Sequence, residues 1–356
     1  MNPSHILIIK SHSMGIGDLL RSSAAWKAIK MKWPHAKLHL LMLSKHPGYP
    51  TEQLMSEHYL LESASFVAVT STTPHDSKHK YRPWSEIKSN IVSKLGNWPI
   101  DLIVDCEPYG LRTSLLTRWL SKHYQAQSVG IAQFALRKYF YSHASVSVHA
   151  YIKHHNLTRP LDYTERDFVA LGALGITRNS LGISLSVTNS GEEWKKNHLL
   201  LTNQYPMVTL NIGCGTIDAM PRRPQLDSMA DCMVGLFQVA PYQLHLSGAD
   251  FEKEINHLFL EKFTTKLKKL NLRCDVMDWA GECDLSQLTG LLGASDLVIS
   301  SDSGPYHMAV ALQVPTLCWF NFDMPEAYHL DKHVKILVLP KVAEFVQSCQ
   351  ALLQLA

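Results

Sequence analysis

The sequence predicts an α/β protein built from two Rossmann-like domains that face each other across a cleft. The chain has 356 residues, which is more than one ordinary domain needs. Short runs of β-branched and apolar residues alternate with helical patterns, which is typical of parallel α/β sheets. This alternation starts near the N-terminus and begins again at residue 207. Two successive α/β domains follow from these observations.

The first series opens with a strand, a glycine-containing loop, a helix and a second strand. The helix is expected to end before Pro34, because proline cannot continue the helical hydrogen bonds. Later in this half, an exposed loop rich in His, Pro, Ser and Lys is expected between buried strands. The predicted strands cover 5–10, 37–43, 66–69 and 101–105, the helices 19–32 and 161–175, and the loop 70–84.

The second series follows a polar stretch, 176–204, which is interpreted as the connection between the domains and an initial helix. The predicted strands cover 207–212, 243–247, 296–301 and 315–320, and the helices 251–270, 285–293, 305–312 and 342–355. We therefore expect domains over 1–180 and 181–340. The last segment, 341–356, is expected to form a helix that packs back on the first domain.

Charge is distributed unevenly along the chain. Residues 1–180 carry 21 Lys and Arg against 12 Asp and Glu, whereas residues 181–356 carry 13 against 19. The basic first half favours an anionic partner, either a phosphorylated substrate or an anionic membrane surface; ordinary surface charge is the alternative. Dense Lys and Arg clusters with interleaved aromatics, which nucleic-acid binders carry, are absent from the sequence.

The cysteines and the apolar runs indicate a cytoplasmic protein. The seven cysteines include no Cys-x-x-Cys pair, so buried reduced thiols are expected rather than a disulfide or metal framework. The apolar runs are too short to span a bilayer, and the N-terminus shows no signal-peptide pattern.

The most informative segment is 296–320, in which a strand runs into a Ser-Asp-Ser-Gly-Pro turn and a helix. We expect Ser303 to cap this helix, and Pro305 fits its first turn because a missing N–H costs nothing there. Gly304 would allow close approach of a ligand, and the N–H groups of the helix start would face an anion such as a diphosphate. An ordinary strand–helix turn is the alternative.

The same segment resembles the signature of glycosyltransferase family 9, the lipopolysaccharide heptosyltransferase family. The resemblance implies the glycosyltransferase-B fold, with a nucleotide-sugar diphosphate bound at the signature loop. The matching residues are Asp302, Ser303, Gly304, His307, Met308, Ala309, Ala311, Leu312, Pro315 and Thr316. His307 is expected either to bind a phosphate or the acceptor, or to satisfy a backbone group.

The opening segment, 6–34, is also similar to that family, and Asp18 matches its catalytic carboxylate. A hydroxyl attacks an anomeric carbon only if a base removes its proton, and a carboxylate can do so. The alternative is that Asp18 only caps the helix. The loop before Asp18, with Ser13, Gly15 and Gly17, is about two residues longer than usual in the family, so we expect it to shape the acceptor side. Its Gly-x-Gly is a weak match to a dinucleotide fingerprint.

Two further segments are similar to donor-binding parts of the family. Arg222 and Arg223 occupy the stretch in which the family carries a phosphate-binding lysine, and an arginine can pair with a diphosphate bidentately. An exposed arginine pair without a ligand is the alternative. Glu252 or Glu254 would bind the ribose hydroxyls, although carboxylates on exposed helices are usually only solvated.

These resemblances imply an inverting glycosyltransferase that moves a heptose from ADP-heptose to an anionic lipopolysaccharide core. No Asp-x-Asp occurs, so we expect arginine and a helix start, not a metal, to hold the diphosphate, and no cofactor. The enzyme is expected in the cytoplasm, or bound peripherally at the cytoplasmic face of the inner membrane through its basic first domain. The alternatives are a nucleotide-sugar epimerase, an NAD-dependent enzyme and a non-catalytic relative that binds sugar nucleotides.

Overall fold

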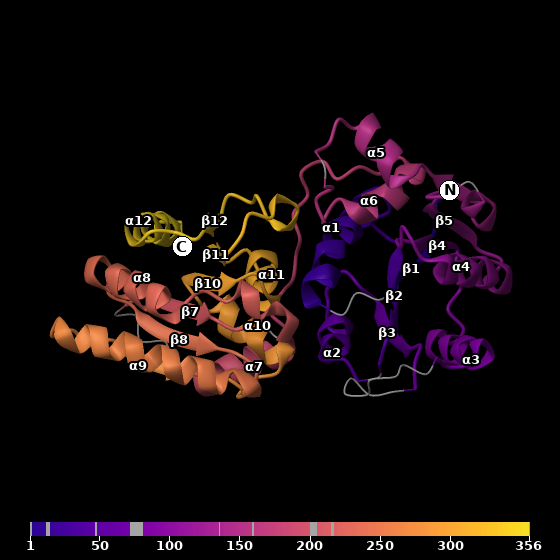
Figure 1. The fold of residues 1–356 in the computed structure, drawn as a ribbon. Helices are drawn as coiled ribbons and strands as arrows, with labels where there is room; N and C mark the ends of the chain where they lie inside the picture. Colours follow the sequence, from indigo (N-terminus) through magenta and orange to yellow (C-terminus); the bar gives the residue numbers. More distant parts are fainter. Residues whose placement is uncertain are drawn as a thin grey trace. The chain divides into compact units, whose positions relative to one another are not determined.

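The computed structural model describes residues 2–11, 15–46, 48–71, 81–134, 136–158, 160–199, 205–214 and 217–355. It divides the chain into two compact units, Met1–Ile183 and Ser184–Ala356. Each unit is a six-stranded parallel sheet with helices on both faces (Figure 1). The predicted α/β class with two Rossmann-like domains is therefore confirmed. Among the described residues, no helix combines the length and the apolar character needed to cross a membrane.

The first domain has the strand order β3-β2-β1-β4-β5-β6. Its strands are β1 His5–Ser11, β2 Lys37–Ser44, β3 Ser63–Ala68, β4 Leu102–Asp105, β5 Gln127–Ile131 and β6 His143–Ser145. Its helices are α1 Ile16–Lys32, α2 Pro50–Ser56, α3 Trp84–Leu95, α4 Leu111–Tyr124, α5 Val148–His154 and α6 Arg166–Leu171, with short 3-10 turns η1 Arg137–Phe140 and η2 Gly172–Leu174. The chain order reverses between β1 and β4, and ligands of such sheets bind beyond the carboxyl ends of strands at this point.

Burial on both faces explains why the central strands are almost wholly apolar. In β1, Leu7 and Ile9 face the core formed with α3 and α4, while Ile6 and Ile8 are buried on the other face. Helices α1 and α2 lie on the opposite side of the sheet from α3 and α4 (Figure 1).

The second domain repeats this topology, with the order β12-β11-β10-β7-β8-β9. Its strands are β7 Met207–Asn211, β8 Gln243–Ser247, β9 Val276–Asp278, β10 Leu297–Ser301, β11 Thr316–Phe320 and β12 Val334–Val338. Its helices are α7 Asn189–His198, α8 Leu226–Val239, α9 Lys253–Lys269, α10 Leu285–Gly293, α11 Gly304–Ala311 and α12 Val342–Leu353, with 3-10 turns η3 Ile217–Arg222, η4 Asp250–Glu252 and η5 Pro325–Ala327. Here the order reverses between β7 and β10.

The C-terminal helix belongs to the second domain, so the expectation that it packs on the first domain is wrong. In α12, Phe345, Cys349 and Leu352 are fully buried in the core of the second domain, together with side chains of α8. These three positions lie on one side of the helix. Helix α12 also contacts β11 and β12, the two strands that precede it in the chain.

Most predicted elements occur, with differences at their ends. The predicted helix over 161–175 is two short turns, α6 and η2. Most of the loop predicted over 70–84 lies outside the described residues, and α3 starts at its end. The structure adds elements that the sequence analysis did not predict: α2, α3, α4, α5, α8, β5, β6, β9 and β12.

Candidate active site

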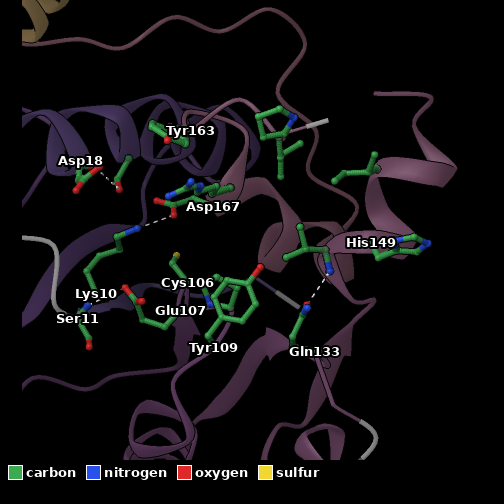
Figure 2. Close-up of a pocket in the computed structure, with 17 residues that line it drawn as sticks. Lys10, Ser11, Asp18, Cys106, Glu107, Tyr109, Gln133, His149, Tyr163 and Asp167 are labelled. Atoms are coloured by element: carbon green, nitrogen blue, oxygen red, sulfur yellow. Dashed lines mark hydrogen bonds and ion pairs between the residues drawn. The ribbon is translucent and has the colours of Figure 1, made fainter. Parts of the chain in front are cut away.

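The first domain holds a pocket of about 620 Å³ at the reversal point of its sheet. Its walls come from the end of β1, the start of α1, the segment after β4, and the segments around α5 and α6 (Figure 2). The lining residues are Lys10, Ser11, Asp18, Ser22, Cys106, Glu107, Pro108, Tyr109, Gln133, Val148, His149, Ile152, Pro160, Leu161, Tyr163, Arg166 and Asp167. This is where a parallel sheet of this order binds ligands.

Asp18 lies on the wall of this pocket with an exposed side chain. It is the third residue of α1, and Gly15 in extended conformation occupies the N-cap position. The alternative that Asp18 is the N-cap is therefore wrong. A carboxylate in the first turn of a helix is stabilised by the partial positive charge of the helix start.

The remaining loop residues separate in the structure. Gly15 precedes the helix, whereas Gly17 is a buried residue inside α1. The Gly-x-Gly match therefore falls partly on a helix rather than on a loop. Ser13 lies outside the described residues.

An ion pair that the sequence analysis missed forms the floor of the pocket. Lys10 Nζ lies 2.7 Å from Asp167 Oδ1, and both side chains are buried. Burial alone would lower the pKa of Lys10, but the carboxylates of Asp167 and Glu107 raise it above its ordinary value. Lys10 is therefore charged at neutral pH, and it lines the same pocket as Asp18 (Figure 2).

Glu107 adds a second carboxyl group to this floor. Its Oε1 accepts a hydrogen bond of 2.8 Å from the Ser11 backbone N–H. Burial raises the pKa of Glu107, against the opposing effects of Lys10 and the Ser11 N–H. The only sequence signal for Lys10 and Glu107 is that both are polar at the ends of buried strands.

In the second domain, the signature residues gather at the ends of β10 and β7. Helix α11 starts at Gly304, with Pro305 in its first turn as expected. The predicted cap is wrong: Ser303 is in the N-cap position, but its side chain does not bond the helix start. Its hydroxyl donates instead to Asn211 Oδ1, 3.0 Å away at the end of β7. The Ser303 side chain thus does not cap α11.

The two arginines face different carboxylates. Arg222 Nη1 lies 3.1 Å from Asp302 Oδ2, and Arg223 Nη2 lies 3.7 Å from Glu252 Oε1. The Arg222 side chain is 41% exposed and that of Arg223 17%. Asn321 fixes the backbone here, since its Nδ2 donates to the Arg223 carbonyl oxygen at 2.6 Å. Arg222 is therefore the cation that solvent or a ligand can reach beside the signature turn.

Glu252 is buried, so it is not the solvated helix carboxylate of the alternative interpretation. Its Oε2 accepts a hydrogen bond of 2.9 Å from the Ala249 N–H. Gly213 makes room for it, because a Cβ at that position would lie 1.8 Å from Glu252 Oε1. Glu254, in contrast, is exposed on the first turn of α9.

His307 is buried on α11 between a histidine and a carboxylate. Its Nδ1 lies 2.9 Å from His329 Nε2, and its Nε2 lies 3.9 Å from Asp302 Oδ1. The second domain thus brings together the predicted residues Asp302, Ser303, Gly304, Pro305, His307 and Arg222, with Arg223 and Glu252 paired to each other. The sequence analysis missed Asn211, Asn321 and His329. Among the described residues, no cluster of three or more His, Cys, Asp or Glu has the arrangement of a metal site.

Part of the chain matches a known family in sequence. Residues 256–350 match the family model described as glycosyltransferase family 9 (heptosyltransferase). This range contains α10, β10, the signature turn and α11. No curated protein matches the sequence.

Solved structures share the fold over the whole chain. The glycosyl transferase family 9 protein from Veillonella parvula has a TM-score of 0.71 at 13% identity, with 100% of this chain and 98% of that chain covered. The E. coli ADP-heptose lps heptosyltransferase II has a TM-score of 0.66 at 16% identity, with 100% and 99% covered. E. coli heptosyltransferase WaaC with ADP-2-deoxy-2-fluoro heptose has a TM-score of 0.64 at 18% identity, with 98% and 99% covered.

At these identities the structural likeness concerns the fold, in which two parallel α/β domains follow one another. The sequence match covers the part of the second domain that carries the signature residues. Together these findings confirm the resemblance that the motifs indicated: residues 256–350 are similar to glycosyltransferase family 9, and the whole chain shares the fold of solved heptosyltransferase structures.

Proposed function

We propose that the protein is an inverting glycosyltransferase in which Asp18 is the catalytic base. The observation that carries this proposal is the exposed Asp18 carboxylate, placed on the wall of the 620 Å³ pocket beside the charged Lys10. An acceptor hydroxyl bound there would lose its proton to Asp18 as its oxygen attacks the anomeric carbon of the donor. The bond from that carbon to the diphosphate breaks, and the nucleoside diphosphate leaves with the electron pair.

The donor side of the proposal rests on the second domain. The positive end of α11, which the Ser303 side chain does not cap, and the exposed guanidinium of Arg222 offer positive charge to a leaving diphosphate. Ser303, Gly304 and Pro305 would line the diphosphate, His307 and Asp302 the sugar, and Glu252 and Arg223 the nucleoside. This arrangement neutralises the diphosphate without a divalent metal, in line with the missing Asp-x-Asp motif.

An ADP-activated heptose is the donor that we propose. E. coli WaaC, which shares the fold, is described in complexes with ADP and with ADP-2-deoxy-2-fluoro heptose. For the acceptor we propose an anionic glycolipid such as lipopolysaccharide core, because the pocket presents Lys10, Arg166 and His149. Ser13, Gly15 and Gly17 would shape the acceptor side. Such an enzyme would act in the cytoplasm, at the inner membrane.

Release of ADP from ADP-heptose, measured with and without a core-truncated lipopolysaccharide, tests the proposal. We expect wild-type release to need the acceptor, and Asp18→Asn to slow it about 10²- to 10⁴-fold, the usual contribution of a general base. ADP binding should stay unchanged, because Asp18 is in the other domain from the donor residues. The matched control is Glu192→Gln, which neutralises an acidic residue in the first turn of α7.

Each alternative predicts a different result in this assay. An epimerase would convert the sugar nucleotide without acceptor and without ADP release. A non-catalytic relative would bind ADP but release none from the donor. Equal rates for Asp18→Asn and wild type would remove Asp18 from the mechanism.

A further inference from the structure

A long segment of the first domain carries no acidic residue. Between Glu107 and Asp162 the sequence has no Asp or Glu, but seven Lys or Arg and five His. On α4, Arg112, Arg118 and Lys122 are exposed, and Lys138 is exposed on η1. This part of the surface therefore presents positive charge without any anion of its own.

Most of the exposed large apolar side chains of the first domain lie in this same segment. Ten such side chains are exposed among the described residues of the first domain, and seven of them lie between 109 and 146. These seven are Tyr109, Leu111, Leu115, Phe134, Leu136, Tyr139 and Val146, at 67%, 60%, 44%, 62%, 74%, 66% and 50% exposure. Exposed apolar side chains that cluster in this way mark an interaction surface, whereas scattered ones do not.

Contacts between α4 and η1 place the exposed side chains of these two elements side by side. Leu111, Leu115 and Arg118 lie three or four residues apart, so they share one side of α4. Arg118 Nη1 donates a hydrogen bond of 3.4 Å to the Tyr139 carbonyl oxygen, and its guanidinium lies 5.7 Å from the centre of the Phe140 ring. The apolar side of α4 thus continues onto η1. We call the seven apolar residues with Arg112, Arg118, Lys122 and Lys138 the cationic apolar patch.

A buried network holds the patch in its exposed position. Arg137 of η1 is buried, and its guanidinium pairs with Asp105 Oδ2 at 3.4 Å and donates to the carbonyl oxygens of Glu107 and Pro108. The Tyr141 hydroxyl donates to the same Asp105 oxygen at 2.7 Å. These contacts anchor η1 to the end of β4, so Phe134, Leu136 and Tyr139 cannot turn inward without breaking buried polar contacts.

The patch adjoins the pocket that holds Asp18. Tyr109 belongs to both, and the pocket residue Gln133 directly precedes Phe134. Val148, two residues after Val146, also lines the pocket. Figure 2 shows Tyr109, Gln133 and His149 along the part of the pocket away from Asp18 and Lys10.

We infer that the cationic apolar patch docks the protein on an anionic lipid bilayer. Exposed aromatic and aliphatic side chains enter the headgroup region, while Lys and Arg pair with anionic headgroups, and the two effects together give stable binding. A second copy of the chain fits less well, because two acid-free cationic faces repel each other. The inference rests on the proposed function and deepens it, since a glycolipid held in the same bilayer would present its sugar beside the pocket.

Sedimentation of the full-length protein with vesicles tests this inference. We expect binding to vesicles of phosphatidylglycerol and phosphatidylcholine, weakening as NaCl rises, and little binding to phosphatidylcholine alone. The variant Phe134→Ser/Leu136→Ser/Tyr139→Ser should lose about tenfold in partitioning for each side chain replaced. Lys122→Gln/Lys138→Gln, which removes two of the four cations of the patch, should weaken the salt dependence.

The matched control is Val239→Ser/Leu270→Ser/Leu330→Ser, which replaces exposed apolar side chains of the second domain. It should bind vesicles like the wild type. Equal binding by the Phe134, Leu136 and Tyr139 variant and the wild type would overturn the inference. Absence of vesicle binding by the wild type would overturn it as well. If the wild type instead self-associates as its concentration rises, and the variant does not, the patch binds a second copy of the chain.

The readout does not depend on catalysis, because vesicle binding needs neither donor nor acceptor. The three serine substitutions lie outside the pocket lining and outside the core, so they should leave ADP release on a delipidated acceptor unchanged. A failed transferase assay with intact vesicle binding would contradict the proposed function alone. A loss of folding in the first domain would appear as faster hydrogen exchange of the β1 amides in the variant.

Discussion

Lys10 Nζ and Asp167 Oδ1 lie 2.7 Å apart, although 157 residues separate them in the sequence. The pair joins the end of β1 to α6 at the floor of the pocket. Asp167 Oδ2 is buried without a hydrogen-bond partner, so this carboxylate depends on Lys10 for compensation of its charge. The pair therefore joins two elements of the pocket floor, and removal of Lys10 alone leaves the Asp167 charge uncompensated.

We predict that Lys10→Met destabilises the first domain by about 3–5 kcal/mol, because it leaves the Asp167 carboxylate buried without its cation. The triple variant Lys10→Met/Asp167→Asn/Glu107→Gln should recover most of this loss, since no charge then remains to be buried. Hydrogen exchange of the β1 amides measures the first domain separately from the second. A triple variant no more stable than Lys10→Met would show that packing, not charge, explains the loss.

Replacement of Glu107 should stabilise the first domain at neutral pH, whereas replacement of Lys10 should destabilise it. Burial raises the pKa of Glu107 in the folded state, so the folded domain favours the protonated form. Its contribution is therefore fully present below the ordinary pKa, 4.5, and is lost as pH rises through the higher folded value. Glu107→Gln should make the domain more stable than wild type at pH 7 and equally stable at pH 4. A variant less stable at pH 7 would mean that the Ser11 N–H and Lys10 outweigh burial.

The central strands and the signature turn could be predicted because their determinants are local. Buried runs such as 6–9 admit few alternatives to a parallel strand, and a Ser-Gly-Pro turn before a helix restricts the backbone. Asp18 was predicted from the residues around it, through their resemblance to the family motif, and its catalytic role stays a prediction. Local pattern therefore predicts the central strands and the signature turn.

Long-range partners could not be predicted from local patterns. Ser303 would suit a helix cap, but Asn211, 92 residues away, accepts its hydrogen bond instead. The apolar side of α12 predicted a buried helix, yet nothing in the pattern said which domain it covers. Lys10 and Asp167 were each unremarkable in sequence, and only the fold brings them together.

Arg222 and Arg223 should differ in what they contribute. Arg222 is the more exposed and faces Asp302 at the signature turn, so Arg222→Ala should weaken ADP binding about 10- to 100-fold by removing a charged hydrogen-bond donor. Arg222→Lys should restore only part, because lysine cannot bind a phosphate bidentately. Isothermal titration calorimetry measures both, with Arg273→Ala, an exposed arginine of the same domain, as control.

Arg223 faces the buried Glu252, and its own side chain is mostly buried. Arg223→Ala should therefore lower the melting temperature of the protein, since it leaves a buried carboxylate without its cation. ADP should recover part of that loss if binding still occurs. If Arg222→Ala binds ADP like the wild type and Arg223→Ala binds ADP much more weakly, Arg223 rather than Arg222 is the arginine that binds ADP.

His245 on β8 predicts an acid sensitivity of the second domain. Burial lowers its pKa from 6.5 to about 4, and its Nδ1 accepts a hydrogen bond of 3.0 Å from Trp279 Nε1, which requires the unprotonated atom. The folded domain therefore keeps His245 neutral, whereas the unfolded chain takes up a proton below pH 6.5. Its stabilising contribution, about 3 kcal/mol from that difference in pKa, is present above pH 6.5 and is lost as pH falls to about 4.

Replacing His245 should remove this part of the pH dependence. His245→Gln keeps an oxygen that can accept from Trp279 but cannot titrate, so hydrogen exchange of the β7 and β8 amides should change less between pH 7 and pH 4 than in the wild type. His257→Gln is the control, because the His257 side chain stays 73% exposed in the folded protein. If the wild type and His245→Gln lose stability in parallel over this range, other groups carry the acid sensitivity, and the neutral His245 contributes nothing to it.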